Sequence, residues 1–548
     1  MKAAPVSRAV RSALEDAARY LDTGEVMQSI ELAQNIAEAE PRLAEARALI
    51  ADCLGALGDL DGADRAATQA LDLDRKNVRA LVVIGRLLIT QGRFQEAELP
   101  LRAAFGLDRR SPKAAGALGE VLVRLERPEE ARRVVYAQAL SQHATDAVLV
   151  AYAEALAALG HPDAADVWIR LAKRWPDDAF WASKAAASLE QHHRDSEALS
   201  WAQLAAHGPE VRVAATLCLA RIYKRAGALD EAEVQIRAML EYRPDDAEGL
   251  RLLSELIWER TADLDQAVGP LNAAIERNPS ASTPRVIRAK LLEYADLQRE
   301  AYESLGPQPF ASLDLNVAAI QAALQFDPAL ALEHARTLAD QAPEWSESRI
   351  LLADALMASG KAAEAMEVVD ALLMAEPYNQ HAIGLKGSAL RCLSDPAATE
   401  YSDYQRLVGE WTVAPPAGWS DSRSWLLELA SSLNQLHQAK AHPLGQSLRG
   451  GSQTALDLTR VEDPVVQSFF KAIDAPIRAH MLKLGRGRDV TRLRSTGRYR
   501  VSNAWSVRLQ PGGRHENHHH PAGWLSSAFY VSVPPAVDDG DRQGWLQF

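Results

Sequence analysis

The sequence predicts a mainly α-helical protein, in which a long solenoid of helical repeats precedes a smaller C-terminal region that contains β-strands. Two observations support this prediction. Small residues recur with a step of 34 residues from Met1 to about Gly409, and a fixed period of about 20 to 50 residues is typical of repeat architectures. Towards the end of the chain, polar and apolar residues alternate between glycines and prolines, a pattern that indicates strands and turns.

The repeat is defined by small residues inside the helices and by a glycine between them. A small residue allows the two helices of one repeat to approach closely, and glycine accommodates the turn that joins them. The 34-residue step is kept by the alanines Ala63, Ala97, Ala131 and Ala165, by the later pairs Ala198 and Ala232, Ala267 and Ala301, and Ala331 and Ala365, and by the glycines Gly24, Gly58 and Gly92, with Gly160 two steps after Gly92.

These positions resemble the consensus of the tetratricopeptide repeat (TPR) family. The segment from Val78 to Asp108 is a good single example, with small and apolar residues at Leu81, Gly85, Gly92, Ala97, Leu101 and Ala104. The resemblance implies about ten to eleven repeats over residues 1–410, arranged as a right-handed α-solenoid. Its concave face is expected to bind a protein or peptide. The alternative is that the array is a spacer or a self-association module.

Composition restricts the function classes. The chain has 548 residues and a net charge of −13, which argues against nucleic acid as the main partner. Its three cysteines, Cys53, Cys218 and Cys392, lie far apart and are typical of a reducing compartment. No apolar run is long enough to cross a membrane. We therefore expect a cytoplasmic protein without a membrane partner.

A proline- and glycine-bearing stretch, residues 411–421, is the predicted linker between the array and a second domain over residues 422–548. Hydrophobic periodicity and turn residues assign elements on both sides of this linker. The assignments are helices over 397–408, 422–437 and 463–484, a surface loop over 442–454, strands over 498–501, 505–509 and 524–533, and a turn at 511–513.

Four of the 14 histidines fall within residues 515–520. In a strand, alternate side chains share a face, so His518 and His520 would point the same way, about 7 Å apart at Cβ. One metal ion can span that distance, and imidazole suits Fe, Zn, Cu and Ni. His515 and His519 would face the other way. Glu516 shares the parity of the pair but would lie about 13 Å from His520 along an extended strand.

The C-terminal motifs resemble the 2-oxoglutarate/Fe(II)-dependent oxygenases that bacteria link to TPR arrays. The motifs are Gln446–Thr454, Asn503–Gly513, His518-x-His520-Pro521-x-Gly523-Trp524 and Phe529-Tyr530-Val531. The resemblance implies a partial double-stranded β-helix (jelly roll), Fe(II) as cofactor and 2-oxoglutarate as co-substrate. It also implies His518 as the first iron ligand and His520 as the second, in place of the usual carboxylate. Trp505 and Tyr530 would line the co-substrate pocket.

The implied activity is hydroxylation of a protein or peptide that the TPR array presents. No catalytic residue is assigned. The family pattern also includes a distal histidine and a later arginine or lysine, whereas after His520 the sequence has no histidine and Arg542 is its only basic residue. We therefore expect a fragment of a longer protein, with residues 420–548 poorly stable alone. The alternative function is a non-enzymatic TPR scaffold with an incomplete oxygenase domain.

Overall fold

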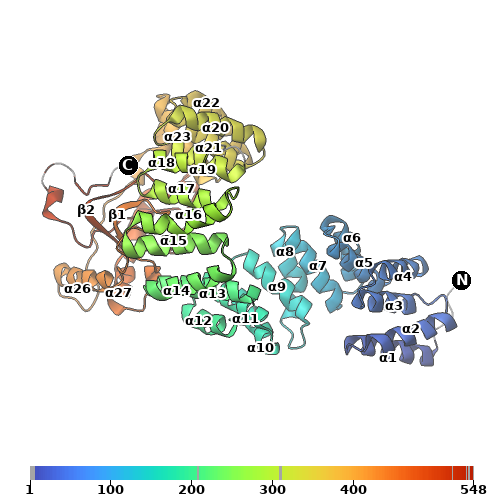
Figure 1. The fold of residues 1–548 in the computed structure, drawn as a ribbon. Coiled ribbons are helices and arrows are strands. Elements are labelled where there is room, and N and C mark those ends of the chain that lie inside the picture. Colours follow the sequence, from blue (N-terminus) through green and yellow to red (C-terminus); the bar gives the residue numbers. More distant parts are fainter. Residues whose placement is uncertain are drawn as a thin grey trace. The chain divides into compact units, whose positions relative to one another are not determined.

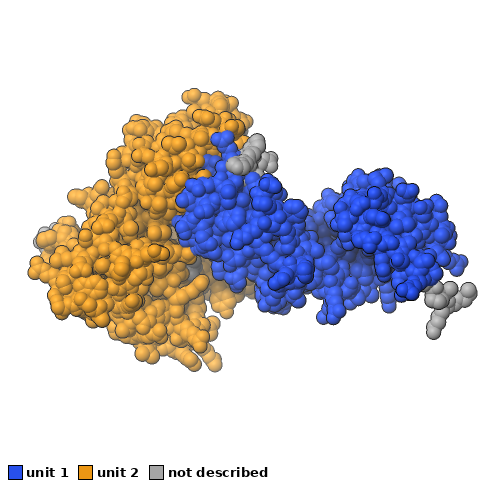
Figure 2. Space-filling model, turned by 90° about the horizontal axis from the view of Figure 1, so that it is seen from below, with its two compact units in different colours: residues 1–218 blue, residues 219–548 orange. Residues whose placement is uncertain are grey.

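The structure, a computed structural model, describes residues 7–206, 209–307, 312–520, 523–538, 540 and 543–546. Pro521, Arg542 and Phe548 of the sequence predictions lie outside these residues. The chain divides into two compact units, residues 1–218 and 219–548 (Figure 2). Both are built from helical hairpins, and the second also holds the C-terminal region, so the predicted boundary near residue 410 falls within it (Figure 1).

The mainly α-helical class is confirmed. The first unit contains α1 (Arg8–Asp22), α2 (Val26–Ala39), α3 (Ala44–Ala56), α4 (Leu60–Leu73), α5 (Val78–Thr90), α6 (Phe94–Leu107), α7 (Pro112–Arg124), α8 (Pro128–Ala139), α9 (Asp146–Ala158), α10 (Ala164–Arg174), α11 (Ala179–Gln191) and α12 (Asp195–Leu204). The division between the units falls within α13 (Pro209–Arg225).

The second unit continues the hairpins and ends in the C-terminal region. Its repeat helices are α14 (Leu229–Tyr242), α15 (Ala247–Thr261), α16 (Leu264–Arg277), α17 (Thr283–Tyr294), α18 (Gln298–Ser304), α19 (Leu313–Ala323), α20 (Pro328–Gln341), α21 (Ser346–Ala358), α22 (Ala362–Ala375), α23 (Gln380–Cys392), α24 (Ala398–Tyr401) and α25 (Tyr404–Leu407). The C-terminal elements are α26 (Ser422–Gln435), β1 (Leu448–Gln453), α27 (Pro464–Ala472), α28 (Asp474–Leu484) and β2 (Val507–His515).

The small positions of the repeat are buried as predicted. The alanines that keep the 34-residue step, from Ala63 to Ala365, are fully buried where hairpins pack together. In the second unit, α15, α17, α19, α21 and α23 each pack against the next of these helices as well as against their hairpin partners. We call these five helices the inner layer. None of the helices in the described part of the chain is long and apolar enough to cross a membrane.

The turn inside the hairpins has a recurring backbone conformation. Gly24, Gly58, Gly92 and Gly160 have φ values of 85°, 81°, 72° and 62°, the left-handed conformation in which many helices end. The structure extends the series to residues that are not glycine. These are Glu126 (φ 57°), His193 (φ 54°), Ala262 (φ 59°), Asp296 (φ 63°) and Ser394 (φ 56°).

The C-terminal region has its own hydrophobic core. Trp425 and Leu429 of α26 pack with Leu458, Val461 and Val466, and partly buried aromatic residues of α27 surround them. The Trp425 Nε1 donates a hydrogen bond of 2.9 Å to the Ser468 Oγ. The predicted helix over 463–484 is divided at residue 473 into α27 and α28. Its sequence contains Pro476, and a proline cannot donate the i→i−4 hydrogen bond that a continuous helix requires.

Strands β1 and β2 form an antiparallel pair, with Leu448 opposite His515 and Gln453 opposite Val507. The predicted loop over 442–454 is therefore wrong for its second half, which is β1. The predicted turn at 511–513 is also wrong. Residues 510–513 form a bulge within β2 opposite Gly450. A side chain at Gly513 would place its Cβ 2.0 Å from the Gly450 carbonyl oxygen, so only glycine fits there.

Two further predicted strands are not formed. Residues 498–501 and 524–533 have no regular secondary structure, although both are rich in aromatic or β-branched residues. Their side chains are used for packing instead. Phe529 and Val531 pack against the core around Trp425, and the Trp524 Nε1 donates a hydrogen bond to the Thr491 carbonyl oxygen. The two-stranded sheet corresponds to only part of a jelly roll.

Candidate functional site

The candidate site lies at the end of β2, in residues 514–520, which we call the histidine segment. β2 ends at His515, so the strand geometry predicted for His518 and His520 is wrong. The two rings nevertheless come together, with their centroids 5.0 Å apart. The chain bends after β2, and the His518 Nδ1 hydrogen bonds to the Glu516 carbonyl oxygen at 2.8 Å.

His515 joins this pair instead of facing away from it as predicted. Its ring centroid lies 5.8 Å from that of His518, and its Nδ1 is 2.9 Å from the Ser447 Oγ. Burial lowers the pKa of His515 and of His520, and the adjacent His518 ring lowers both further. Both shifts favour neutral imidazole, the form that binds a metal ion.

The histidines alone do not make up the ligand set that an iron site of the expected kind requires. Two imidazoles at this separation fit two ligands of one Fe(II) ion. The described residues contain no group of three or more histidine, cysteine, aspartate or glutamate side chains arranged to hold a metal ion. They therefore do not form a complete set of two histidines and one carboxylate, and we assign no reaction step to them.

Of the two aromatic residues predicted to line a co-substrate pocket, only Trp505 lies beside the histidines. Its ring centroid is 5.7 Å from that of His520, and its side chain is 38% exposed. Tyr530 is 52% exposed. The described ring contacts and hydrogen bonds include none between Tyr530 and the histidine segment. The structure thus brings together His518, His520 and Trp505.

The histidine segment and β1 are anchored to the inner layer by Asp296, in the turn after α17. Arg514 Nη2 donates to one carboxylate oxygen of Asp296 at 2.9 Å, and Arg449 Nε donates to the other at 3.3 Å. The Arg449 guanidinium also lies 5.3 Å from the centroid of the Tyr294 ring. Two arginines on adjacent strands therefore share one aspartate of the TPR array.

A second anchor comes from the chain that precedes β1. The Trp258 Nε1 of α15 donates to the His442 carbonyl oxygen at 2.8 Å, and the two rings meet edge to face. The His442 Nε2 lies 2.9 Å from the carbonyl oxygen of Tyr294. Burial lowers the pKa of His442. Lys440 extends the contact by donating its backbone N–H to the Glu259 carbonyl oxygen at 2.7 Å.

The other end of the histidine segment contacts α23. The rings of His519 and His381 have centroids 4.7 Å apart. The His381 Nε2 is 3.2 Å from Asp354 Oδ1 of α21, and this carboxylate raises the pKa of His381. Arg514 thus contacts the turn after α17, and His519 contacts α23. The histidine segment therefore joins helices that lie on either side of α19 in the inner layer.

His437, just after α26, connects the remaining parts of the region. Its Nδ1 lies 2.9 Å from the Ser452 Oγ of β1, and its Nε2 lies 3.0 Å from the Ser506 Oγ before β2. Burial, with a smaller effect of Arg508, lowers its pKa to about 4. Sequence reasoning missed His437, His442 and Asp296. The one available signal was an aspartate at the turn position where other repeats have glycine.

These features define a class of protein, namely a helical-repeat array that carries a histidine-bearing, two-stranded C-terminal region on its inner layer. Comparison with family models identifies both parts. Residues 54–115, 84–147 and 322–388 match models described as Tetratricopeptide repeat. Residues 503–547 match a model described as Putative 2OG-Fe(II) oxygenase. The chain therefore contains tetratricopeptide repeats, and its residues 503–547 are similar to this oxygenase family.

Several solved structures are similar to the chain at low sequence identity. Yeast Tom70 is 13% identical, with a TM-score of 0.34, over 86% of this chain and 97% of its own. PilF of Pseudomonas aeruginosa is 20% identical, with a TM-score of 0.28, over 45% of this chain and 97% of its own. A TPR protein of Parabacteroides merdae is 13% identical, with a TM-score of 0.28, over 46% and 100%. No curated protein matches the sequence. We infer no ligand or partner from these likenesses.

Proposed function

We propose that this chain belongs to a 2-oxoglutarate/Fe(II)-dependent dioxygenase that hydroxylates a protein or peptide bound by its TPR array. The observation that carries the proposal is the placement of the oxygenase-family segment. Its histidine segment is fixed to the inner layer at both ends, by Asp296 and by His381. A polypeptide held by these helices would therefore lie next to His518 and His520.

Iron binding tests the proposal most directly. We expect the full chain to bind one Fe(II), or Co(II) as an optical probe, with His518 and His520 as ligands. His518→Ala and His520→Ala should each weaken binding by at least about tenfold. His143→Ala, at an exposed histidine of the first unit, is the matched control. Equal metal affinity in all four proteins would contradict the ligand assignment.

Turnover of 2-oxoglutarate separates the proposed enzyme from the alternative of a non-enzymatic TPR scaffold. A dioxygenase converts 2-oxoglutarate to succinate in the presence of Fe(II) and O2, and His518→Ala should abolish that conversion. The scaffold alternative predicts peptide binding without succinate. The cytoplasmic location remains a prediction from the sequence.

A further inference from the structure

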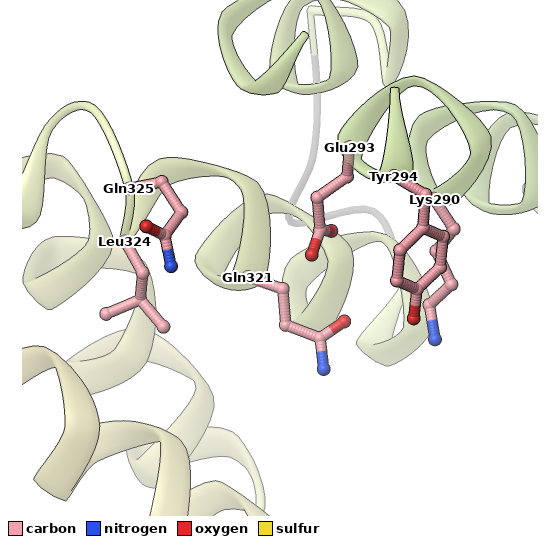
Figure 3. Close-up of a pocket in the computed structure, with 6 residues that line it drawn as sticks. All are labelled: Lys290, Glu293, Tyr294, Gln321, Leu324 and Gln325. Atoms are coloured by element: carbon pink, nitrogen blue, oxygen red, sulfur yellow. The ribbon is translucent and has the colours of Figure 1, made fainter. Parts of the chain in front are cut away.

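A polar pocket lies in the inner layer between α17 and α19. Its volume is about 220 Å³, several times the roughly 30 Å³ that one water molecule occupies in the liquid. It is large enough for one long side chain. The lining residues are Lys290, Glu293, Tyr294, Gln321, Leu324 and Gln325 (Figure 3).

The pocket contains a carboxylate, Glu293, that forms no direct ion pair, although Lys290 and Arg449 are close enough to act on its charge. Glu293 is partly buried, and no hydrogen bond or ion pair joins its side chain to the rest of the described chain. Burial raises its pKa, against the smaller opposing effects of Lys290 and Arg449. Figure 3 shows Glu293 and the amides of Gln321 and Gln325 around one space. Lys290 is exposed, so its ammonium group is already hydrated.

This chemistry selects a cation. A desolvated carboxylate gains most from a ligand that brings positive charge and N–H donors. The two glutamine amides can accept further hydrogen bonds from the same group. A ligand carboxylate would lie against Glu293 and be repelled. We propose that the pocket between α17 and α19 binds the basic side chain, lysine or arginine, of a polypeptide ligand.

The position of the pocket connects this proposal to the histidine segment. Tyr294 lines the pocket and also contacts Arg449 of β1. Two residues further on, Asp296 holds Arg514, where the histidine segment begins. A polypeptide anchored here by a basic side chain lies beside His515 to His520. If the proposed function holds, and the inference rests on it in this respect, this polypeptide is the hydroxylation substrate.

Peptide binding to the full chain tests the pocket without iron or 2-oxoglutarate. The probes are short fluorescein-labelled glycine–serine peptides with one central arginine, lysine, citrulline or glutamate, and the readout is fluorescence anisotropy. We expect the arginine and lysine peptides to bind and the citrulline and glutamate peptides to bind at least tenfold more weakly. A citrulline peptide that binds as tightly as the arginine peptide would overturn the proposal, because citrulline keeps the shape and lacks the charge.

Two variants locate the binding. Glu293→Gln should weaken the arginine peptide about tenfold, or about 1.4 kcal/mol, whereas Glu276→Gln removes an exposed carboxylate of α16 and should change nothing. Gln325→Lys places an amine at the exposed rim and should also weaken binding, so the test does not depend on the folding of Glu293→Gln. Unchanged affinity in both pocket variants refutes the assignment. Iron binding by His518 and His520 is measured separately. A failure of the pocket proposal can therefore be told apart from a failure of the proposed dioxygenase function.

Discussion

Arg514, the penultimate residue of the bulged strand β2, donates a hydrogen bond to Asp296, which precedes it by 218 residues and lies in a hairpin turn of the TPR array. The same carboxylate accepts a hydrogen bond from Arg449 of β1, whose side chain is only 10% exposed. The left-handed backbone of Asp296, with φ 63°, occurs at the position where other repeats have glycine. A residue of the repeat turn thus also holds both strands of the C-terminal sheet.

Asp296→Asn tests this anchor. Asparagine also tolerates a left-handed backbone, so the change removes mainly the charge. The exposed pair with Arg514 contributes about 0.5 kcal/mol, and loss of the charge beside the buried Arg449 guanidinium about 1 kcal/mol more. We expect roughly tenfold faster amide hydrogen exchange in β1 and β2. Asp340→Asn, at an exposed position of α20, should leave exchange unchanged.

Trp258→Phe tests the second anchor. Phenylalanine keeps an aromatic ring against His442 but loses the N–H that donates to the His442 carbonyl oxygen. A buried carbonyl left without its donor is destabilising by about 1 to 3 kcal/mol. We expect a lower urea midpoint for the second unit and unchanged exchange in the first. A midpoint equal to that of the wild type would show that solvent reaches this carbonyl.

The TPR array could be predicted in detail because its pattern is local and repeated. Alanines at the 34-residue step are buried, and glycines at the same step have a left-handed backbone. The residues that replace glycine at that turn position could not be predicted. Glu126 and Ser394 are poor choices for a positive φ, and their backbone is set by the packing of the hairpins on either side.

The site was less accessible to sequence reasoning. His518 and His520 were paired on the assumption of a strand, and they come together through a bend after β2 instead. Asp296 and His442 form hydrogen bonds with residues that are more than a hundred positions away in the sequence. No local pattern contains such a contact. The polar 446–454 motif lacked strand character because two of its glycines are required for close approach to β2.

Glu126→Gly should stabilise the first unit. The left-handed conformation of a residue such as glutamate is unfavourable by about 1 kcal/mol or more, and glycine adopts it without a steric penalty. The greater freedom of glycine in the unfolded chain offsets part of this gain. We expect a net increase of about 0.5 kcal/mol in the free energy of unfolding, measured with urea. Glu126→Ala keeps the Cβ and should give no increase.

The last prediction concerns pH and His437. Its pKa is lowered to about 4 in the folded protein, against about 6.5 in an unfolded chain. The unfolded chain therefore binds a proton first as the pH falls. The stability associated with the neutral ring is fully present above pH 6.5 and is lost as the pH falls from 6.5 towards 4, by at most about 2 kcal/mol at pH 5. The groups that face the ring are Ser452, Ser506 and Arg508.

His437→Gln isolates this effect from that of the other histidines. Glutamine can still hydrogen bond to Ser452 or Ser506 but does not titrate. We therefore measure urea unfolding at pH 7 and pH 5. Between these pH values His437→Gln should lose less free energy of unfolding than the wild type, by at most about 2 kcal/mol. His143→Gln, at an exposed histidine, should behave like the wild type. An identical acid loss in all three proteins would show that His437 is protonated in the folded state near its ordinary pKa, and that its two serine contacts do not depend on a neutral ring.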